Sequence, residues 1–567
     1  MNDHRNSPHI VILGGGLAGL SALHTLRGAL PSAIGDNAKI TLIEAAESVG
    51  GKVKSLAERG PDGSVLFWHD LGPHSFRTQG RGEVTLRLVR ELGIADQLVR
   101  ASPSSASRLV FSKGAMQKVT WMFALSLAGW KSVIRHFRLI FCNIHATTLL
   151  QSPSLSVHRA LHVLVGRNFA DVFGNSLARG IYAGDAHDLT MIDAFPVVSD
   201  GLRKYLQNPW SFLIKPLLAM ADWLTVHCFS QVPQIFKWTS GKSTSNADQT
   251  NSNALSDQPA IYSFRNGMHQ LPMAIHKAAH SDDRVTFMLG KTIRKIYKVS
   301  AGIDDRQLLI CLENDETVCA DYVVCALPSS SMLEIFVNSR LHTSEFGALP
   351  ACDTEIEKIL CTMKYRSVHV VNYFAKTSIG PHSNAFGYLT HQADDPVLGV
   401  IFDSKIFPSR YPEGSTVCTA MLRPSYALTK NHALQHGVEA NLCGDFAQEK
   451  YYHCFSRIAF ERAFRSGAQA NGGFRGLLRG FMRDAQQSPC AAGMEGEFHH
   501  YDWLHAIPQY TSGHYTKVKA MRDILEEHCP EITLCGCSYD GVSVNDAIYS
   551  GIEQAKRLVT LIERRGS

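Results

Sequence analysis

Residues 10–19 read Ile-Val-Ile-Leu-Gly-Gly-Gly-Leu-Ala-Gly, and this stretch decides the fold. The apolar run 10–13 predicts a short buried strand, the glycines predict a tight turn, and residues 17–30 predict a helix. A second strand is expected at residues 39–43, which completes a β-turn-α-β unit. In such a unit the glycines let the backbone approach a pyrophosphate, and the positive end of the helix faces the anion. The opening of the chain therefore predicts a dinucleotide-binding fold.

Two features downstream of the glycine turn support the same interpretation. Glu44 ends the second strand, where its carboxylate can accept hydrogen bonds from both hydroxyls of an adenosine ribose. An acid at this position favours an unphosphorylated ribose over NADP. Gly50 and Gly51, followed by Lys52, would let a second loop approach the dinucleotide. A chance glycine-rich turn would not explain this combination.

Length and composition narrow the class of protein. The chain has 567 residues, of which 45% are hydrophobic and 19% charged, and these values are typical of a globular protein with more than one domain. The formal net charge of +5 is small for this length, so no nucleic-acid partner is expected. The 14 cysteines are scattered, without paired CxxC spacing. Neither a metal site nor a disulfide framework is therefore expected.

Two apolar segments raise the question of membrane contact. Residues 121–144 and 210–236 are rich in Trp, Phe and Leu but carry interleaved basic residues, and no stretch reaches about 18 uninterrupted apolar residues, so a spanning helix is not expected. Basic residues among aromatic ones suit a helix that lies in a membrane interface. Core helices of a substrate domain explain the pattern equally well. Residues 1–9 lack an apolar signal core or an Arg-rich amphipathic pattern, so a cleaved targeting segment is not expected.

The glycine turn, Glu44 and the Gly50-Gly51 pair resemble the opening of the flavin-containing amine oxidase superfamily, whose members use FAD rather than NAD. Its other FAD segments resemble Ile293, residues 323–328 and residues 536–551. Residues 539–546 look like a loop that feeds a helix, and the positive helix end would stabilise negative charge on a reduced flavin. The resemblance implies that FAD is held by Gly14, Gly15, Gly16, Leu17, Ala18, Gly19, Glu44, Ala45, Gly50, Gly51, Lys52, Gly72, Pro73, His74, Ser75, Ile293, Gly541, Val542, Ser543, Val544 and Asn545.

Within this superfamily, five segments are similar to the protoporphyrinogen oxidase family of the mitochondrial type. They are residues 72–75, 179–185, 265–272, 507–514 and 539–551. The resemblance implies FAD-dependent oxidation of protoporphyrinogen IX to protoporphyrin IX in haem biosynthesis, with dioxygen as acceptor and hydrogen peroxide as product. Because flavin N5 carries the chemistry, no dedicated catalytic residue and no metal are expected.

The expected substrate is a large apolar macrocycle with propionate groups, so an apolar slot with a cation at its mouth is the chemistry to look for. Arg108 is the candidate cation, and the alternative is an exposed surface arginine. Phe386 and Leu389 match family positions that sandwich the ring, Ile401 and Met421 match further wall positions, and the carbonyl of Gly180 is a candidate partner for pyrrole N–H groups. Plain core packing is the alternative for the apolar residues.

The resemblance implies an α/β protein with a Rossmann-like FAD-binding domain, a discontinuous α+β substrate domain and a helical membrane-binding domain. The FAD-binding domain is expected at 1–90, 259–330 and 501–567. The helical membrane-binding and substrate region is expected at 91–238, and the substrate-binding domain at 331–500. Insertions are expected at 239–258, which is polar, and at about 431–496.

Location and partners follow from the resemblance alone. Family members in eukaryotes attach to the mitochondrial inner membrane on its intermembrane-space side without spanning it, so a membrane surface is an expected partner. A homodimer and a contact with ferrochelatase are further expectations. Two other functions stay open: another enzyme of the superfamily, such as an amine oxidase or a carotenoid desaturase, and a non-catalytic scaffold that has lost its flavin.

Overall fold

The computed structural model describes residues 8–34, 38–103, 107–129, 152, 154–200, 260–303, 306–341, 353–377, 385–424 and 496–566. The predicted polar insertion at 239–258 and the apolar segment at 210–236 lie outside the described residues. So do residues 431–495 of the second predicted insertion and residues 130–144 of the first apolar segment.

A five-stranded parallel sheet forms the dinucleotide-binding part of the molecule. Its strand order is β10-β2-β1-β14-β20. The bounds are β1 His9–Leu13, β2 Lys39–Ile43, β10 Val285–Met288, β14 Tyr322–Cys325 and β20 Ile532–Leu534. The sequence predicts strands at 10–13, 39–43, 285–288, 322–326 and 532–534, and the structure confirms all five. Short apolar runs bounded by turn residues predicted them, because a parallel strand is buried on both faces.

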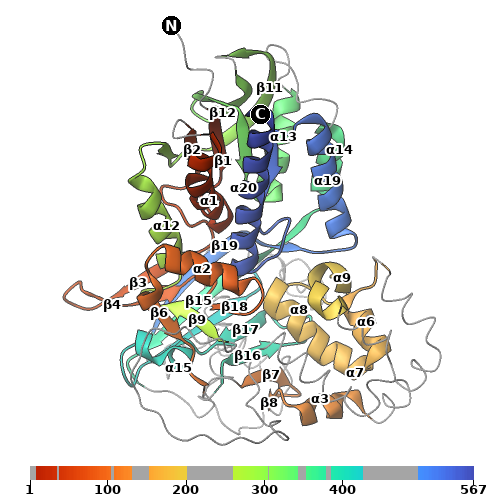
Figure 1. Cartoon of the computed structure of the whole chain (residues 1–567). Helices are drawn as coiled ribbons and strands as arrows, with labels where there is room; N and C mark the ends of the chain where they lie inside the picture. Colours follow the sequence, from red (N-terminus) through yellow and green to blue (C-terminus); the bar gives the residue numbers. More distant parts are fainter. Residues whose placement is uncertain are drawn as a thin grey trace, which may run out of the picture.

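Two long helices, α1 (Leu17–Ile34) and α20 (Val544–Gly566), lie side by side on this sheet, although they come from opposite ends of the chain (Figure 1). Gly551 allows the contact, because a Cβ at this position would lie 2.1 Å from the carbonyl oxygen of Ala18. The other face is covered by α13 (Ser329–Leu341), α14 (Asp353–Cys361) and α19 (His514–His528), together with the antiparallel strands β11 (Ile293–Ile303), β12 (Arg306–Leu312) and β13 (Thr317–Ala320).

Apolar residues recur at helical spacing from 84 to 98 and predict one helix over that stretch, but the observed helix is shorter. In the structure α2 spans Gly82–Glu91, and a 3-10 turn η2 at Ala95–Gln97 leads into strand β6 at Leu98–Arg100. Gly93 adopts a φ of 69°, a left-handed conformation that ends a helix and suits glycine. Strand β6 then pairs with β9 (Ile261–Phe264), which also pairs with β5 (Phe76–Arg77).

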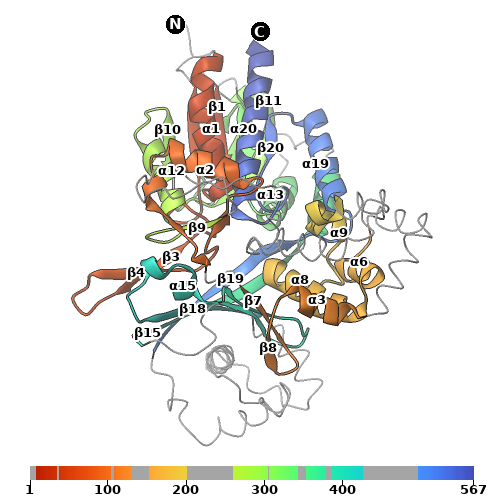
Figure 2. The same cartoon turned by 60° about the horizontal axis from the view of Figure 1, so that its bottom comes forward.

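A mixed seven-stranded sheet lies beneath the dinucleotide-binding part, and Figure 2 shows it with the bottom of the molecule turned forward. Its order is β19-β15-β18-β17-β16-β7-β8. The bounds are β7 Arg108–Ser112, β8 Ala115–Lys118, β15 Lys364–Ala375, β16 Gly387–Thr390, β17 Val397–Ile401, β18 Thr416–Leu422 and β19 Glu497–Gln509. The sheet thus combines strands from three distant parts of the chain.

A separate two-stranded ribbon is attached to the large sheet. Its strands are β3 (Ser55–Arg59) and β4 (Val65–Asp70), and its tip projects from the body of the molecule (Figure 1). Two side chains fasten the residues at its base to the large sheet: Trp503 Nε1 donates to the Leu71 carbonyl at 2.7 Å, and Asn372 Nδ2 donates to the Asp70 carbonyl at 3.2 Å. The short helix α12 (Gln270–His280) packs against β10 and α1.

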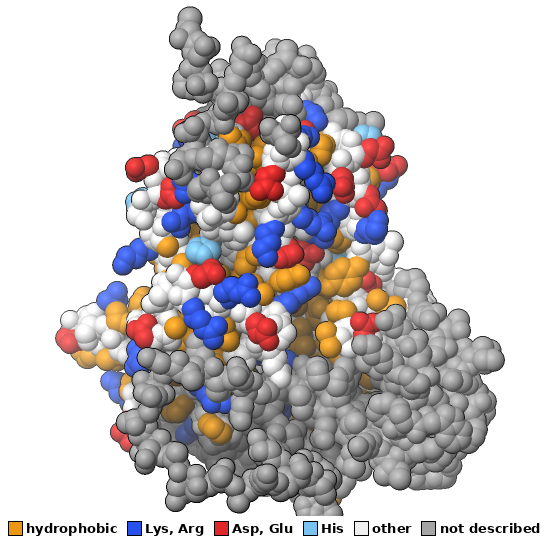
Figure 3. Space-filling view, in the orientation of Figure 1, with side chains coloured by type: hydrophobic (Ala, Val, Ile, Leu, Met, Phe, Trp, Pro, Cys, Tyr) orange, Lys and Arg blue, Asp and Glu red, His pale blue; other side chains and the backbone are white. Residues whose placement is uncertain are grey.

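A group of helices with its own apolar core lies beside the large sheet. It comprises α3 Trp121–Ala128, α6 Val157–Leu164, α7 Arg167–Phe169, the π-helix η4 Ala170–Gly174, α8 Asn175–Tyr182 and α9 Met191–Ala194. The sequence also predicts helices within 156–180, and the structure confirms them. Ser156 caps α6 by accepting a hydrogen bond from the Arg159 amide. Among the described residues no helix is long and apolar enough to cross a membrane. On the face in Figure 3, basic and acidic side chains are interspersed over α2 and α20.

Candidate active site

The glycine turn after β1 packs tightly against the neighbouring backbone. A Cβ on Gly19 would lie 2.0 Å from the carbonyl oxygen of Gly14, and Gly14 itself adopts a φ of 99°. A Cβ on Gly16, by contrast, would meet no protein atom within 4 Å. The turn is therefore closed on the side of the helix and sheet and open at the start of α1. This arrangement suits the approach of a pyrophosphate to the positive end of the helix.

Glu44 lies against this turn, as the sequence predicted. Its Oε2 accepts a hydrogen bond from the Gly15 amide at 2.6 Å, and its Oε1 accepts one from the Ala46 amide at 2.9 Å. The two backbone donors orient the carboxylate beside the glycine turn. The role of Glu44 toward a ribose stays a prediction.

The second glycine pair also reaches the turn. The Gly50 amide donates to the Gly15 carbonyl at 2.8 Å, and a Cβ on Gly51 would lie 3.1 Å from the Gly16 Cα. Gly50 and Gly51 both have positive φ values. The structure therefore brings together three of the predicted cofactor segments: residues 14–19, the Glu44-Ala45 pair and the Gly50-Gly51 pair.

Lys52 and Gly72 connect this site to the loop that follows β4. A Cβ on Gly72 would lie 2.0 Å from the Lys52 carbonyl oxygen, so only glycine fits there. The Lys52 ammonium donates to the carbonyl oxygen of His505 at 2.8 Å, and burial lowers its pKa. Lys52 therefore holds the site against β19.

Hydrogen bonds fix the predicted cofactor segment at 541–545, where α20 begins. The Gly541 amide donates to the Tyr510 hydroxyl at 2.7 Å, and Asn545 donates through Nδ2 to the Arg77 carbonyl at 2.9 Å. Asn545 thereby ties the start of α20 to the segment that follows Pro73 and Ser75. Of the remaining predicted cofactor residues, Val544 opens α20, Val542 and Ser543 precede it, and Ile293 opens β11.

His74 belongs to a buried polar network that the sequence did not indicate. Its Nδ1 lies 2.7 Å from Asp403 Oδ1, and the Asp403 Oδ2 accepts a hydrogen bond from the Thr419 hydroxyl at 2.7 Å. Burial opposes protonation of His74, but the charges of Asp403 and Asp70 outweigh it and raise its pKa. The loop at 72–75 is thus anchored to α15 (Asp403–Ile406) and β18 by a charged pair. No sequence pattern pairs residues 329 positions apart.

This pair should make stability depend on pH. Because the folded pKa of His74 lies above the unfolded value of about 6.5, its contribution is complete below that value and is lost as pH rises through the folded pKa. We therefore expect His74→Gln to lower the Tm most near pH 6, with a smaller difference from the parent protein near pH 9. His528→Gln, at an exposed histidine ending α19, controls for loss of a histidine. A difference that does not vary with pH would contradict this expectation.

The predicted substrate residues converge on the large sheet. The strand register places Arg108, Gly387 and Ile401 side by side in one row across the sheet. Two residues further along β16, it places Leu389, Gly399 and Met421 in another row. Residues two apart on a strand share a face. Arg108, Leu389, Ile401 and Met421 therefore lie on the same face of the sheet, and we call this face the apolar wall.

Arg108 and Phe386 stack at the edge of the apolar wall. The guanidinium carbon of Arg108 lies 3.6 Å from the centre of the Phe386 ring, a distance at which a cation is attracted to the ring face. Burial, and after it the charge of Arg77, lowers the pKa of Arg108 to about 9. A carboxylate from a ligand would offset both effects. The structure thus contradicts the alternative of an exposed surface arginine.

Gly180 lies directly over Leu389. A Cβ at Gly180 would lie 2.7 Å from Leu389 Cδ2, so α8 contacts the sheet through a position where only glycine fits without movement. Arg179, the residue before it, is buried and donates to the carbonyl oxygens of Asp395 and Val397 at 2.6 and 2.9 Å. These contacts fix α8 at one end of the apolar wall. Whether the Gly180 carbonyl accepts a hydrogen bond from a ligand stays a prediction.

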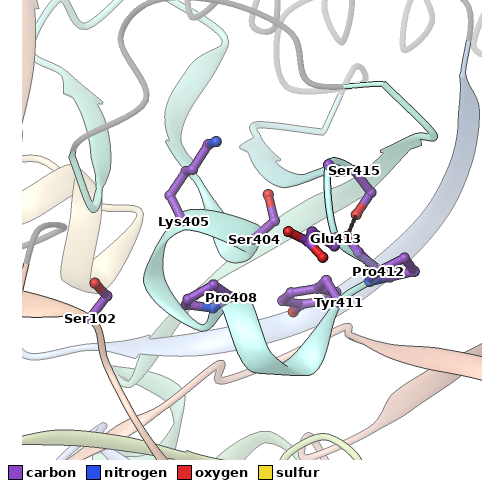
Figure 4. Close-up of a pocket in the computed structure, with 9 residues that line it drawn as sticks. Ser102, Ser404, Lys405, Pro408, Tyr411, Pro412, Glu413 and Ser415 are labelled. Atoms are coloured by element: carbon purple, nitrogen blue, oxygen red, sulfur yellow. Dashed lines mark hydrogen bonds between the residues drawn. The ribbon is translucent and has the colours of Figure 1, made fainter.

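A separate hollow of about 440 Å³ opens beside α15 and the 3-10 turn η6 (Pro408–Arg410) (Figure 4). Its lining residues are Ser102, Ser404, Lys405, Pro408, Tyr411, Pro412, Glu413, Gly414 and Ser415. No residue of the apolar wall or of the glycine turn lines this hollow, so it is distinct from the candidate active site.

Comparison with known families accounts for this architecture. A family model described as flavin containing amine oxidoreductase matches residues 17–438, which is more than half of the chain. The chain belongs to the flavin containing amine oxidoreductase family. This flavin amine oxidoreductase is therefore an FAD-dependent enzyme, and its fold of mixed α/β sheets is that of the family.

Several known proteins are similar to this flavin amine oxidoreductase over nearly its whole length. A protoporphyrinogen oxidase of Homo sapiens is 27% identical and aligns over 96% of this chain and 97% of its own. A protoporphyrinogen oxidase of Schizosaccharomyces pombe is 24% identical over 98% of this chain and 99% of its own. A structure from Exiguobacterium sp. 255-15, assigned as a protoporphyrinogen oxidase, has a TM-score of 0.64 at 16% identity and covers 98% of this chain and 99% of its own. That likeness shows the fold.

The residues at the glycine turn fit an FAD molecule. The open space before Gly16, the start of α1 and the oriented Glu44 carboxylate lie together, and the Gly50-Gly51 pair closes the other side. These are the groups that a dinucleotide requires: a small backbone, a helix N-terminus and a ribose acceptor.

Proposed function

We propose that this protein oxidises protoporphyrinogen IX to protoporphyrin IX in haem biosynthesis, with dioxygen as the final acceptor and hydrogen peroxide as product. The observation that carries the proposal is the stacked Arg108–Phe386 pair at the edge of the apolar wall, because an apolar macrocycle with propionate groups needs both an apolar surface and a cation. The named relatives with similarity over the whole chain support the same substrate.

The residues of this chain would bind and orient the substrate. Bound FAD supplies the acceptor for the hydrogen and electrons that leave the macrocycle. Arg108 would hold a propionate, and Phe386 would support the guanidinium. Leu389, Ile401 and Met421 would contact the ring and exclude water from it. No acid or base of this chain is required to carry out the redox chemistry itself.

The direct test is an assay of the purified protein. Its visible spectrum is recorded first, and freshly reduced protoporphyrinogen IX is then added in air while porphyrin fluorescence is followed against an enzyme-free control. A yellow protein that accelerates the rise supports the proposal. Parallel assays with coproporphyrinogen III and with amines detect a different substrate, since peroxide formed only from amines would favour an amine oxidase. A colourless protein would favour a scaffold.

Arg108 provides the sharpest mutational test. We expect Arg108→Met to raise KM for protoporphyrinogen by roughly 10- to 100-fold, because a hydrogen-bonded ion pair contributes about 1.5–3 kcal/mol. The kcat should change less than KM, since the propionate lies away from the reacting carbon. Arg87→Met, at an exposed position of α2, is the control. Equal KM values for the three proteins would exclude Arg108 from substrate binding.

We further propose that the enzyme attaches to the mitochondrial inner membrane from the intermembrane-space side. The exposed Met122 of α3, of which 64% is accessible, supports contact with a membrane surface. A homodimer and a contact with ferrochelatase are proposed on the family resemblance alone. Flotation with cardiolipin-containing vesicles tests attachment, and Met122→Asp should reduce the bound fraction. Unchanged flotation of this variant would exclude α3 as the contact.

A further inference from the structure

Three side chains from three strands meet where the β3–β4 ribbon lies on the large sheet. Glu58 Oε2 lies 3.1 Å from His69 Nε2 and 2.9 Å from His499 Nε2. Glu58 and His69 are buried, and 31% of the His499 side chain is exposed. The hydrogen bond with His69 lowers the pKa of Glu58, burial opposes it, and with the further hydrogen bond from His499 the pKa falls to about 2. We call these residues the ribbon triad.

Strand register explains how the ribbon triad forms. Leu56 pairs with His69, and Glu58 pairs with Phe67, so Glu58 and His69 are diagonal neighbours on one face of the ribbon. Phe67 packs edge-on against the His69 ring, with centroids 4.9 Å apart, and holds it in place. His499 comes from β19, the strand at one end of the large sheet. Independently of the triad, hydrogen bonds from Trp503 of β19 and Asn372 of β15 fix the base of the ribbon to the large sheet.

The donor set is one that binds a transition metal. The three ligand atoms all lie within 4.8 Å of one another. Two imidazoles and one carboxylate form the protein ligand set of several zinc sites, which leave a fourth position for water. Two ligand atoms about 2.0–2.2 Å from a tetrahedral zinc lie roughly 3.3–3.5 Å apart. The two observed separations from the Glu58 oxygen, 2.9 and 3.1 Å, would open slightly in this geometry, and the two imidazole nitrogens, which lie within 4.8 Å of each other, would adjust to it.

We propose that Glu58, His69 and His499 form a binding site for a divalent transition metal of the zinc type. The partial exposure of His499 gives the ion a route from solvent and leaves room for a bound water. The ion would join the ribbon to β19, and β4 ends at Asp70, directly before the loop at 71–75. Metal binding would therefore stabilise the base of that loop. This inference does not depend on the identity of the substrate.

A second histidine cluster on the same strand supplies a matched control. His500, the neighbour of His499, points to the opposite face of β19 because side chains alternate along a strand. Its Nδ1 lies 3.1 Å from His369 Nε2, and His369 Nδ1 lies 2.7 Å from Asp502 Oδ1. His500→Asn therefore removes an imidazole next to the ribbon triad without removing a proposed ligand.

The experiment titrates zinc alone into the untagged holoenzyme after treatment with EDTA, in competition with a chromophoric chelator, and measures bound zinc by mass spectrometry. We expect one zinc per chain and a Tm that rises with zinc. Glu58→Gln and His499→Asn should each weaken binding by at least about 10- to 100-fold, the loss that outer partners of metal ligands already cause. His500→Asn should bind zinc like the parent protein.

Three results would overturn the proposal. The parent protein could bind no zinc, in which case the ribbon triad is a hydrogen-bonded cluster. The Glu58 and His499 variants could bind zinc as tightly as the parent protein. Alternatively, His500→Asn could be the variant that loses zinc, which would assign the ion to the other cluster. The flavin spectrum and Tm of each variant establish that it is folded, and the partly exposed His499 is the safer position if Glu58→Gln unfolds.

Discussion

Replacing Gly16 by alanine is expected to leave a folded protein that has lost most of its flavin. A Cβ at Gly16 meets no protein atom within 4 Å, and Gly16 does not have a positive φ, so the protein alone accommodates alanine. The added methyl group would occupy the open space before α1, where the pyrophosphate is expected to approach. An intruding methyl group costs about 1–3 kcal/mol, which lowers flavin affinity roughly 10- to 100-fold. The ratio of absorbance near 450 nm to that at 280 nm measures the effect.

Gly19→Ala is the contrasting variant. Its Cβ would lie 2.0 Å from the Gly14 carbonyl oxygen, so the clash is within the protein and does not involve a ligand. We expect little soluble protein from this variant, with or without added FAD. If Gly16→Ala retained flavin like the parent protein, the cofactor would not approach the chain at this turn. The two glycines would then have only a structural role.

The dinucleotide-binding part of the fold could be predicted because its signals are local. The apolar run at 10–13, the glycines and the run at 39–43 each specify their own conformation within a few residues. Burial of parallel strands on both faces makes them continuous apolar runs, and all five strands of this sheet lie where such runs occur. The end of α2 was missed because the periodic pattern continues past Gly93, whose left-handed conformation stops the helix.

The apolar wall could not have been derived from local patterns. In this wall β7 pairs in parallel with β16, which places Arg108 opposite Gly387. No periodicity in either strand specifies a partner so distant in sequence. The candidate residues came from the resemblance to a family, and the register places four of them on one face. The ribbon triad illustrates the same limit. Its members are 11 and 441 residues apart, so a search for closely spaced metal ligands predicted no metal site.

Buried charges are the other feature that the sequence did not reveal. Asp70 and Arg410 form an ion pair with 2.9 Å between Asp70 Oδ2 and Arg410 Nη1, and their side chains are 0% and 1% exposed. Asp70 Oδ1 also accepts hydrogen bonds from the Ser55 hydroxyl and the Met268 amide, both at 2.7 Å. The pair therefore connects the base of the ribbon, the turn before α12 and the turn η6 at a single point.

Arg410→Met should be among the most destabilising single substitutions in this protein. It leaves the Asp70 carboxylate buried without its cation, and breaking a buried pair in this way costs about 3–5 kcal/mol. We expect a large fall in Tm and loss of soluble protein on mild heating. Lys519→Met is the control, because Lys519 and Asp523 form a pair whose side chains are 75% and 57% exposed, and such pairs contribute at most about 1 kcal/mol.

The double variant Asp70→Asn/Arg410→Met separates the two costs of the broken pair. If the penalty arises from an uncompensated buried charge, neutralising Asp70 should recover part of the Tm lost in Arg410→Met, because asparagine keeps an acceptor for the Ser55 and Met268 donors. If the double variant is no more stable than Arg410→Met, the loss arises instead from the packing and hydrogen bonds of Arg410, which also donates to the Ser263 hydroxyl and the Trp68 carbonyl. A loss of less than about 1 kcal/mol in Arg410→Met, the range of an exposed pair, would show that the charge is not isolated from water.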